Sequence, residues 1–237
     1  MLDEETQLDI AQAAQDRWTE RCEAGEMATY MQRKERGHSL ADFVEDVTVT
    51  MLGRRYAGRT AFQGSGAKRR RRSMGDIWIE SGGVFNPINI KTGVKEPGRR
   101  SGGQPNLVSL TKLTEAVFRR WIDSYYLLII RFVAREPPIV AVTLVDLLHI
   151  VQEFAHFDAG TGQLMLRASK FDDPPAPIYT VAEPRAALAH LLAVREDGNR
   201  RLQAKRESDL ATAKAEMAGF DGSGPLEQTG LELDTPR

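Results

Sequence analysis

Three polar side chains, Asp76, Asn89 and Lys91, interrupt a stretch that otherwise has the pattern of an ordinary β-hairpin, GDIWIESGGVFNPINIKTG at residues 75–93. A carboxylate and an amide oxygen can bind a hard divalent cation such as Mg²⁺. A lysine beside them can stabilise the negative charge that develops on a reacting phosphate. If the three side chains converge, they have the chemistry needed to hydrolyse a phosphodiester bond.

The turn of the hairpin decides whether they converge. Gly82-Gly83 predicts a two-residue turn, because such turns require positive φ. This turn places Asp76 opposite Asn89, with Cβ atoms about 5 Å apart, and Lys91 two residues further along the same face. A bulge at Pro87, which has no N–H for the ladder, would instead shift the pairing by one residue. The opposite face is apolar and would pack into the core: Ile77, Ile79, Ile88 and Ile90.

The elements around the hairpin predict an α/β fold with a central mixed sheet flanked by helices. Helical patterns occur before the hairpin at 4–35 and 39–52, and a helix at 107–123 follows it. We expect the rest in this order: strands at 125–134 and 139–144, a helix at 145–155, a strand at 162–168 and a long helix at 184–217.

We expect a single domain over residues 1–217, with a helical N-terminal part up to about residue 52 and a catalytic core at about 40–168. Residues 218–237 are acidic and rich in Gly, and we expect a disordered tail there.

The composition is typical of a globular protein, with 41% hydrophobic and 27% charged residues. A single cysteine, Cys22, excludes an internal disulfide and any multi-cysteine zinc site. The N-terminus has acids where a secretory signal has basic residues, and the most apolar stretch, 125–148, is interrupted by charges and a Pro-Pro pair. We therefore expect a cytoplasmic protein that does not cross a membrane.

The charge of the chain is unevenly distributed, although the net charge is only -1. Residues 53–120 contain 15 basic and 4 acidic residues, whereas the rest of the chain contains 17 and 29. A strongly basic middle section indicates a polyanionic partner such as nucleic acid. The alternative is a solvated surface that is balanced by its own acidic flanks.

The segments GDIWI and PINIKTG resemble the PD-(D/E)XK nuclease core, most closely that of type II restriction endonucleases, over about residues 40–168. In that family the site consists of an Asp that opens one strand, an acid two residues before a Lys on the next strand, and the Lys itself. The resemblance implies that Asp76 and the backbone carbonyl of Ile90 bind the metal, that Asn89 takes the place of the second acid, and that Lys91 is the catalytic lysine. Gly75 stands where the motif often has proline.

Asn89 departs from the family pattern, because a neutral amide brings one negative charge fewer to the metal. Two other acids resemble those that family members supply from neighbouring helices: Glu45, before the hairpin, and Glu115, after it. We favour Glu45 slightly. Glu80 lies about 13 Å along the strand from Asp76, which is too far to share an ion.

The resemblance implies Mg²⁺-dependent cleavage of double-stranded DNA at a specific sequence by a homodimer that works beside a cognate DNA methyltransferase. The alternatives are a repair or structure-specific nuclease on the same core, and a nucleic-acid-binding module whose catalytic site has decayed. We expect the DNA phosphates to be bound by basic residues on both sides of the hairpin: Lys68, Arg69, Arg70, Arg71, Arg72, Lys95, Arg99 and Arg100.

Overall fold

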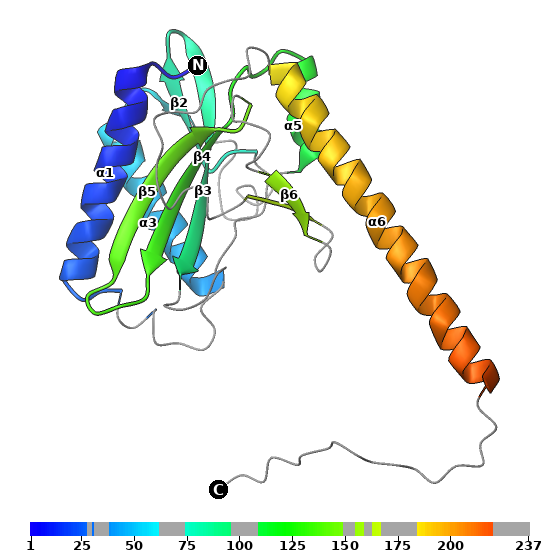
Figure 1. Cartoon of the computed structure of the whole chain (residues 1–237). Helices are drawn as coiled ribbons and strands as arrows, with labels where there is room; N and C mark the ends of the chain where they lie inside the picture. Colours follow the sequence, from blue (N-terminus) through cyan, green and yellow to red (C-terminus); the bar gives the residue numbers. More distant parts are fainter. Residues whose placement is uncertain are drawn as a thin grey trace, which may run out of the picture.

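The computed structural model describes residues 1–27, 30, 38–61, 74–95, 109–148, 155–158, 163–166 and 184–219. A five-stranded sheet with the order β1-β2-β3-β4-β5 forms the centre of the molecule (Figure 1). The strands are β1 (Thr60–Ala61), β2 (Ile77–Ser81), β3 (Val84–Lys95), β4 (Tyr126–Val133) and β5 (Ile139–Asp146). Neighbouring strands are antiparallel except β3 and β4, which are parallel. The predicted α/β fold with a central mixed sheet is confirmed.

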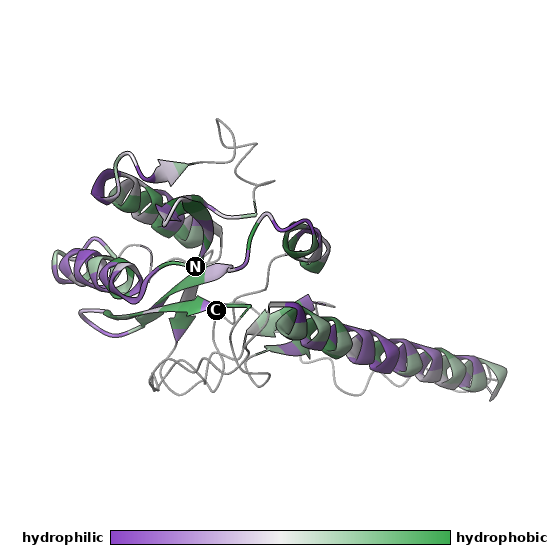
Figure 2. Ribbon diagram, turned by 90° about the horizontal axis from the view of Figure 1, so that it is seen from above, coloured by the Kyte–Doolittle hydropathy of each residue, from purple (hydrophilic) through white to green (hydrophobic). Residues whose placement is uncertain are grey.

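Helices cover both faces of this sheet (Figures 1 and 2). The helices α1 (Glu4–Glu23) and α3 (His38–Arg55) pack on one face, in a core that includes the four isoleucines of the hairpin. The other face carries α5 (Leu110–Phe118), the first turns of α6 (Pro184–Gly219) and a small sheet of β6 (Ala155–Asp158) and β7 (Gln163–Leu166). The sheet is therefore the middle of three layers.

The N-terminal helix is attached to the hairpin through Asp3. The Asp3 carboxylate accepts a hydrogen bond from the Thr6 N–H at 2.7 Å, which caps α1, and another from the Ser81 hydroxyl at 2.9 Å. The hydrogen bonds from Thr6 and Ser81 lower the pKa of Asp3 to about 2. One side chain thus fixes both the start of α1 and its position beside β2.

The helix predicted at 107–123 is shorter in the structure. It ends at Phe118, and Arg120 follows with a φ of 56°, a left-handed conformation that stops the helix. Phe118 and Trp121, two large apolar side chains of the predicted helix, are 57% and 60% exposed.

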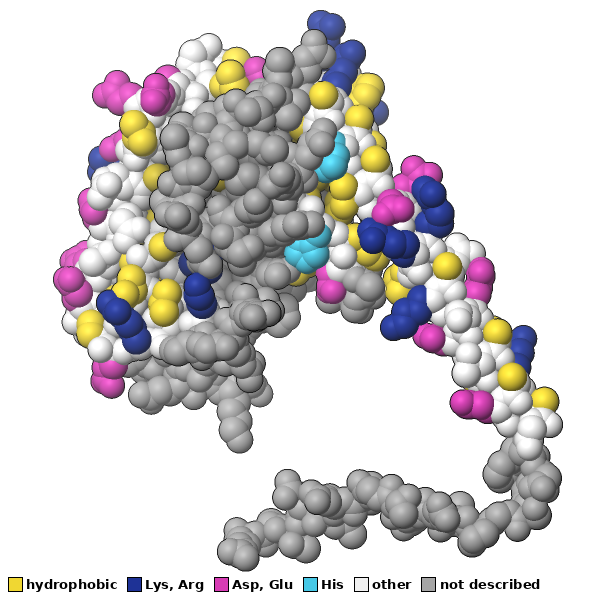
Figure 3. All heavy atoms as spheres, viewed as in Figure 1, with side chains coloured by type: hydrophobic (Ala, Val, Ile, Leu, Met, Phe, Trp, Pro, Cys, Tyr) yellow, Lys and Arg dark blue, Asp and Glu magenta, His cyan; other side chains and the backbone are white. Residues whose placement is uncertain are grey.

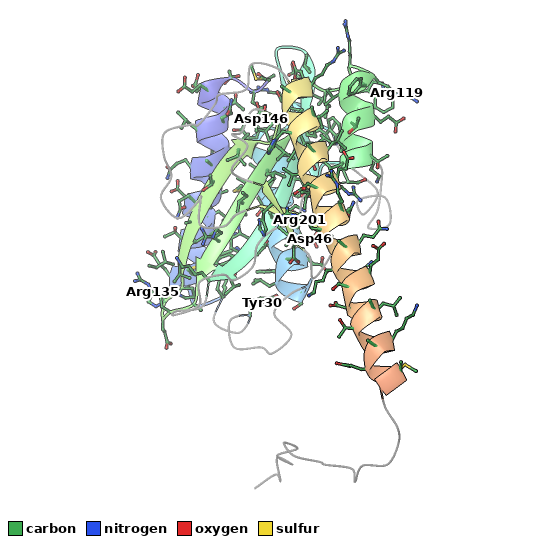
Figure 4. The ribbon with its side chains drawn as sticks, turned by 45° about the vertical axis from the view of Figure 1, so that its right-hand side comes forward. Tyr30, Asp46, Arg119, Arg135, Asp146 and Arg201 are labelled. Carbon is green, nitrogen blue, oxygen red and sulfur yellow. The ribbon has the colours of Figure 1, made fainter. Side chains whose placement is uncertain are left out.

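The helix predicted at 145–155 is wrong at both ends. β5 runs to Asp146, whose partner on β4 is Tyr126, and β6 already begins at Ala155. The Asp146 carboxylate (Figure 4) accepts hydrogen bonds from the backbone N–H groups of Tyr125 and Leu148 at 3.1 and 3.0 Å, so it closes a turn where a helix was expected.

The helix α6 extends two residues into the segment predicted to be a tail, since Ala218 and Gly219 still belong to it. Residues 220–237 lie outside the described part of the chain. Among the helices that are described, none combines the length and the apolar character needed to cross a membrane.

Candidate catalytic site

The hairpin has the register that its Gly-Gly turn predicts. Ser81 pairs with Val84 and Ile77 pairs with Ile88, with no bulge between them. Pro87 faces Trp78, a position whose backbone groups point away from β2 in this register, and β4 pairs with β3 only from Ile88 onward. Pro87 therefore costs the sheet no hydrogen bond, and the alternative register, shifted by one residue, does not occur.

Asp76 lies just before β2 and is held against β3 by two hydrogen bonds. Its backbone N–H donates to the carbonyl of Ile88 at 2.8 Å, and its carboxylate Oδ2 accepts from the backbone N–H of Ile90 at 2.6 Å. The N–H and C=O of one strand residue point to the same side, so the carbonyl of Ile90 also faces the edge where Asp76 lies. The structure thus brings together the two metal ligands that the resemblance implies.

β3 continues past Ile88 beside β4, whereas β2 begins only at Ile77, opposite Ile88. The helix α3 packs against this part of β3 and brings Glu45 to the same place. Burial and the nearby Asp76 carboxylate raise the pKa of Glu45 to about 7, and the positive charge of Lys91 opposes this rise. Burial lowers the pKa of Lys91, while the charges of Asp76 and Glu45 raise it. Glu45, Asp76 and Lys91 therefore form one electrostatic group.

Asn89 lies within this group beside a tyrosine that sequence reasoning did not select. Its side-chain oxygen Oδ1 is buried and has no hydrogen-bond partner among the described residues, whereas its amide forms a hydrogen bond with Tyr125. Burial and the charge of Asp76 raise the pKa of Tyr125 well above its ordinary value. The Tyr125 hydroxyl donates to the carbonyl of Met74 at 2.5 Å. Tyr125 thus joins β3 to the segment that leads into Asp76.

These five residues are the candidates for a catalytic site, and we call them the catalytic group: Glu45, Asp76, Asn89, Lys91 and Tyr125. Gly75 allows the segment before β2 to lie close to β3. A Cβ atom at Gly75 would lie 3.0 Å from the Cβ of Pro87 and 3.2 Å from the backbone nitrogen and oxygen of Ile88. A side chain at position 75 would therefore require Pro87 or the backbone of Ile88 to move by a few tenths of an ångström, which glycine avoids.

The structure distinguishes between Glu45 and Glu115, the two acids that the sequence left as alternatives. Glu115 lies on an exposed face of α5, where its carboxylate pairs with Arg119 at 3.1 Å, and it does not act on the charge of Lys91. Glu80 lies at the turn of the hairpin, where it accepts a hydrogen bond from the N–H of Gly83 at 2.5 Å. Of the three acids considered, Glu45 is the one that the fold brings to Asp76.

Most of the predicted DNA-binding residues fall outside the described residues: Lys68, Arg69, Arg70, Arg71, Arg72, Arg99 and Arg100. Lys95 is described and lies half-buried at the end of β3. In the part of the chain that the structure describes, no three His, Cys, Asp or Glu side chains form a metal-binding cluster. The catalytic group contains two carboxylates, and its third candidate ligand is an amide.

A signal for Tyr125 was present in the sequence. Parallel strands begin at the same edge of a sheet, and the helix between β3 and β4 is the connection that parallel strands require. Tyr126 on β4 pairs with Ile88 on β3, so Tyr125 lies directly before this pair and Asn89 directly after it. A tyrosine at the start of the strand after a crossover helix is thus a candidate for the site formed by the strand before it.

Comparison with known proteins gave no family: neither the protein-family models nor the curated proteins include a match to this chain.

Proposed function

We propose that this protein is a Mg²⁺-dependent endonuclease that cleaves double-stranded DNA at a specific sequence, with the activity of a type II restriction enzyme and a site of the PD-(D/E)XK kind. The observation that supports this proposal is the mutual electrostatic influence of Glu45, Asp76 and Lys91. Two acids and a lysine that are partly withdrawn from water are an unusual grouping, and such groupings concentrate at functional sites.

The residues of the catalytic group fit a Mg²⁺ ion. Asn89 presents a buried amide oxygen without a hydrogen-bond partner among the described residues, and such an atom is costly unless something binds it. Two carboxylates lie close enough to raise the pKa of Glu45, and a divalent cation would relieve this repulsion. Asp76, Asn89, Glu45 and the carbonyl of Ile90 would hold the ion. When bound, Mg²⁺ would polarise the phosphate and favour hydroxide over water.

The residues of the chain itself supply the other parts of the reaction. Asp76 is held by the N–H of Ile90, so its position does not depend on a free side-chain rotamer. Lys91 carries a positive charge in a partly buried place, where it stabilises negative charge on the pentavalent phosphate better than it would in water. Tyr125 is a positioning residue, because it acts on Asn89 and on the Met74 carbonyl.

The assembly and the cellular setting belong to the same proposal. Cleavage of both strands of a palindromic site requires a two-fold homodimer, and the host DNA requires protection by a cognate methyltransferase in the cytoplasm. The basic middle section of the sequence, 53–120, supplies the charge for binding phosphates.

The test is incubation of supercoiled plasmid DNA with the purified protein and Mg²⁺, followed by sequencing of the ends. Discrete fragments with common end sequences are expected. The Lys91→Ala variant should lose cleavage and still bind DNA in Ca²⁺, because most phosphate contacts remain. Cleavage only at branched or damaged DNA would favour a repair nuclease, and binding without any cleavage would favour a decayed module. Full cleavage by Lys91→Ala would overturn the site.

A further inference from the structure

The second half of α6 extends away from the rest of the described structure (Figures 1 and 2). Gly198 marks the last close contact, because a Cβ atom there would lie 2.1 Å from the ring of Phe157 on β6. After Gly198 every residue of the helix is exposed except Leu202, which is partly buried. We call residues 199–219 the arm, and at 1.5 Å per residue it is about 30 Å long.

The arm continues the apolar stripe with which α6 packs against the body. Leu188, Leu191 and Gly198 are buried on one side of the helix. Four apolar residues of the arm follow one another at separations of 8, 3 and 4 residues, which keeps them on this same side of the helix: Leu202, Leu210, Ala213 and Met217. Leu210 and Met217 are 56% and 77% exposed. No element among the described residues covers the stripe in the arm.

The arm has little support of its own. Within the described structure its side chains make two polar contacts, from Arg201 (Figure 4) to Asp197 at 2.8 Å and from Gln203 to Glu207 at 3.0 Å. Helices of this length owe most of their stability to packing against a partner and little to their own propensity. An apolar stripe without a cover is therefore a sign of a partner.

The sequence of the arm divides its charges unequally, and Figure 3 shows both basic and acidic side chains exposed along it. Residues 200–206 contain four basic residues and no acid, and residues 207–219 contain three acids and Lys214. In an antiparallel pair of arms centred near residues 207–208, Arg206 of each copy would lie opposite Asp209 of the other, on the side of the helix that carries the apolar stripe. In a parallel pair, like charges would face each other, which is destabilising.

We propose that the arm is a dimerisation element, which pairs in antiparallel orientation with the arm of a second copy of this chain around a two-fold axis near residues 207–208. The contact is isologous, so it closes at two copies and forms no chain of molecules. This surface gives a location to the homodimer expected above, but the argument for it needs neither DNA nor catalysis.

The first experiment measures molecular mass by light scattering over a range of protein concentrations. The wild-type protein should have twice the 26.4 kDa mass of the chain. The double variant Leu210→Glu/Met217→Glu should have the mass of one chain. The matched control is Ala204→Glu/Ala211→Glu, which adds the same charge to the opposite side of the helix and should remain a dimer. A monomeric wild type, or equal dissociation of both variants, would overturn the proposal.

The second experiment measures the orientation with spin labels on Ser208→Cys and, separately, on Gly219→Cys. The native Cys22 is buried and burial raises its pKa to about 11, so it should not take up the label. Antiparallel arms should give a distance between the two copies that is roughly 30 Å longer at 219 than at 208. Equal distances at the two positions would indicate parallel arms and refute the charge argument. Retention of a dimer with no measurable distance at 208 would assign the contact to another surface.

Discussion

Replacing Glu45 with Gln tests the geometry of the catalytic group directly, because the fold selects Glu45 where the sequence left Glu115 as an alternative. Both Glu→Gln changes keep the size of the side chain and remove one negative charge. Glu45 acts on Lys91 together with Asp76, whereas Glu115 pairs with Arg119 on the surface of α5. If the proposed nuclease activity is present, Glu45→Gln should abolish it and Glu115→Gln should leave it unchanged.

The expected loss follows from the charge balance of the group. When Glu45 is ionised, it and Asp76 carry two negative charges against the single positive charge of Lys91, so Glu45→Gln removes the net negative charge that would attract a cation. Loss of one group that acts electrostatically on a transition state costs about 10²–10³-fold in kcat, or about 3–4 kcal/mol. Part of this loss should be recovered at higher Mg²⁺ concentration, because the metal is then bound by mass action.

The assay is the initial rate of plasmid cleavage over a Mg²⁺ titration, with a thermal melt in EDTA as the control for folding. Because burial disfavours the charged form of Glu45, Glu45→Gln should not melt below the wild-type protein in the absence of metal. Wild-type rates in Glu45→Gln, together with an inactive Glu115→Gln, would move the missing acid to α5 and refute the geometry described here.

Substitutions at three further positions probe the remaining parts of the site and the fold. Asn89→Asp should keep or raise cleavage with a tighter dependence on Mg²⁺, and Asn89→Leu should lose most of it in the same titration; normal cutting by Asn89→Leu would remove this residue from the site. Gly75→Ala places a methyl group 3.0 Å from the Cβ of Pro87 and should lower the free energy of unfolding in urea by about 1–3 kcal/mol, whereas an unchanged urea midpoint would contradict the close contact. Hydrogen bonds from Arg55 and Tyr56 lower the pKa of Asp9 from 3.8 to about 2, so their stabilising effect is present above pH 3.8 and is lost as the pH falls toward 2. Urea midpoints of Asp9→Asn and the wild-type protein should therefore differ at neutral pH and converge near pH 2, and a constant difference would show that the charge of Asp9 is not responsible.

The hairpin was predictable because its determinants are local. A Gly-Gly turn fixes the register, and alternating isoleucines fix which face enters the core. The same reasoning was wrong for the helix expected at 145–155, where a short apolar run is consistent with either a strand or a helix. Val145 and Asp146 belong to a strand because they pair with β4, and their partners on β4 lie about twenty residues earlier in the sequence.

The full catalytic group was not predictable to the same extent. Asp76, Asn89 and Lys91 lie on one hairpin, so sequence spacing alone brought them together. Glu45 reaches them because α3 packs across β3, and Tyr125 reaches them because β4 runs parallel to β3. Both contacts depend on tertiary packing, which neither helical periodicity nor residue spacing specifies.

The unequal lengths of the two hairpin strands explain how one end of an ordinary sheet can become a site. β2 has 5 residues and β3 has 12, so the edge of β3 beyond Ile88 has no strand partner from β2. The carboxylate of Asp76 takes the place of a strand at this edge, because it accepts the N–H of Ile90 that the ladder would otherwise satisfy. A backbone hydrogen bond thus fixes the acid beside Asn89 and Lys91 just before β2 begins, and α3, which packs on β3, brings Glu45 to the same place. The charged residues therefore lie where the pairing of β2 with β3 stops. This place is set by Ile77, the first isoleucine of β2, which pairs with Ile88.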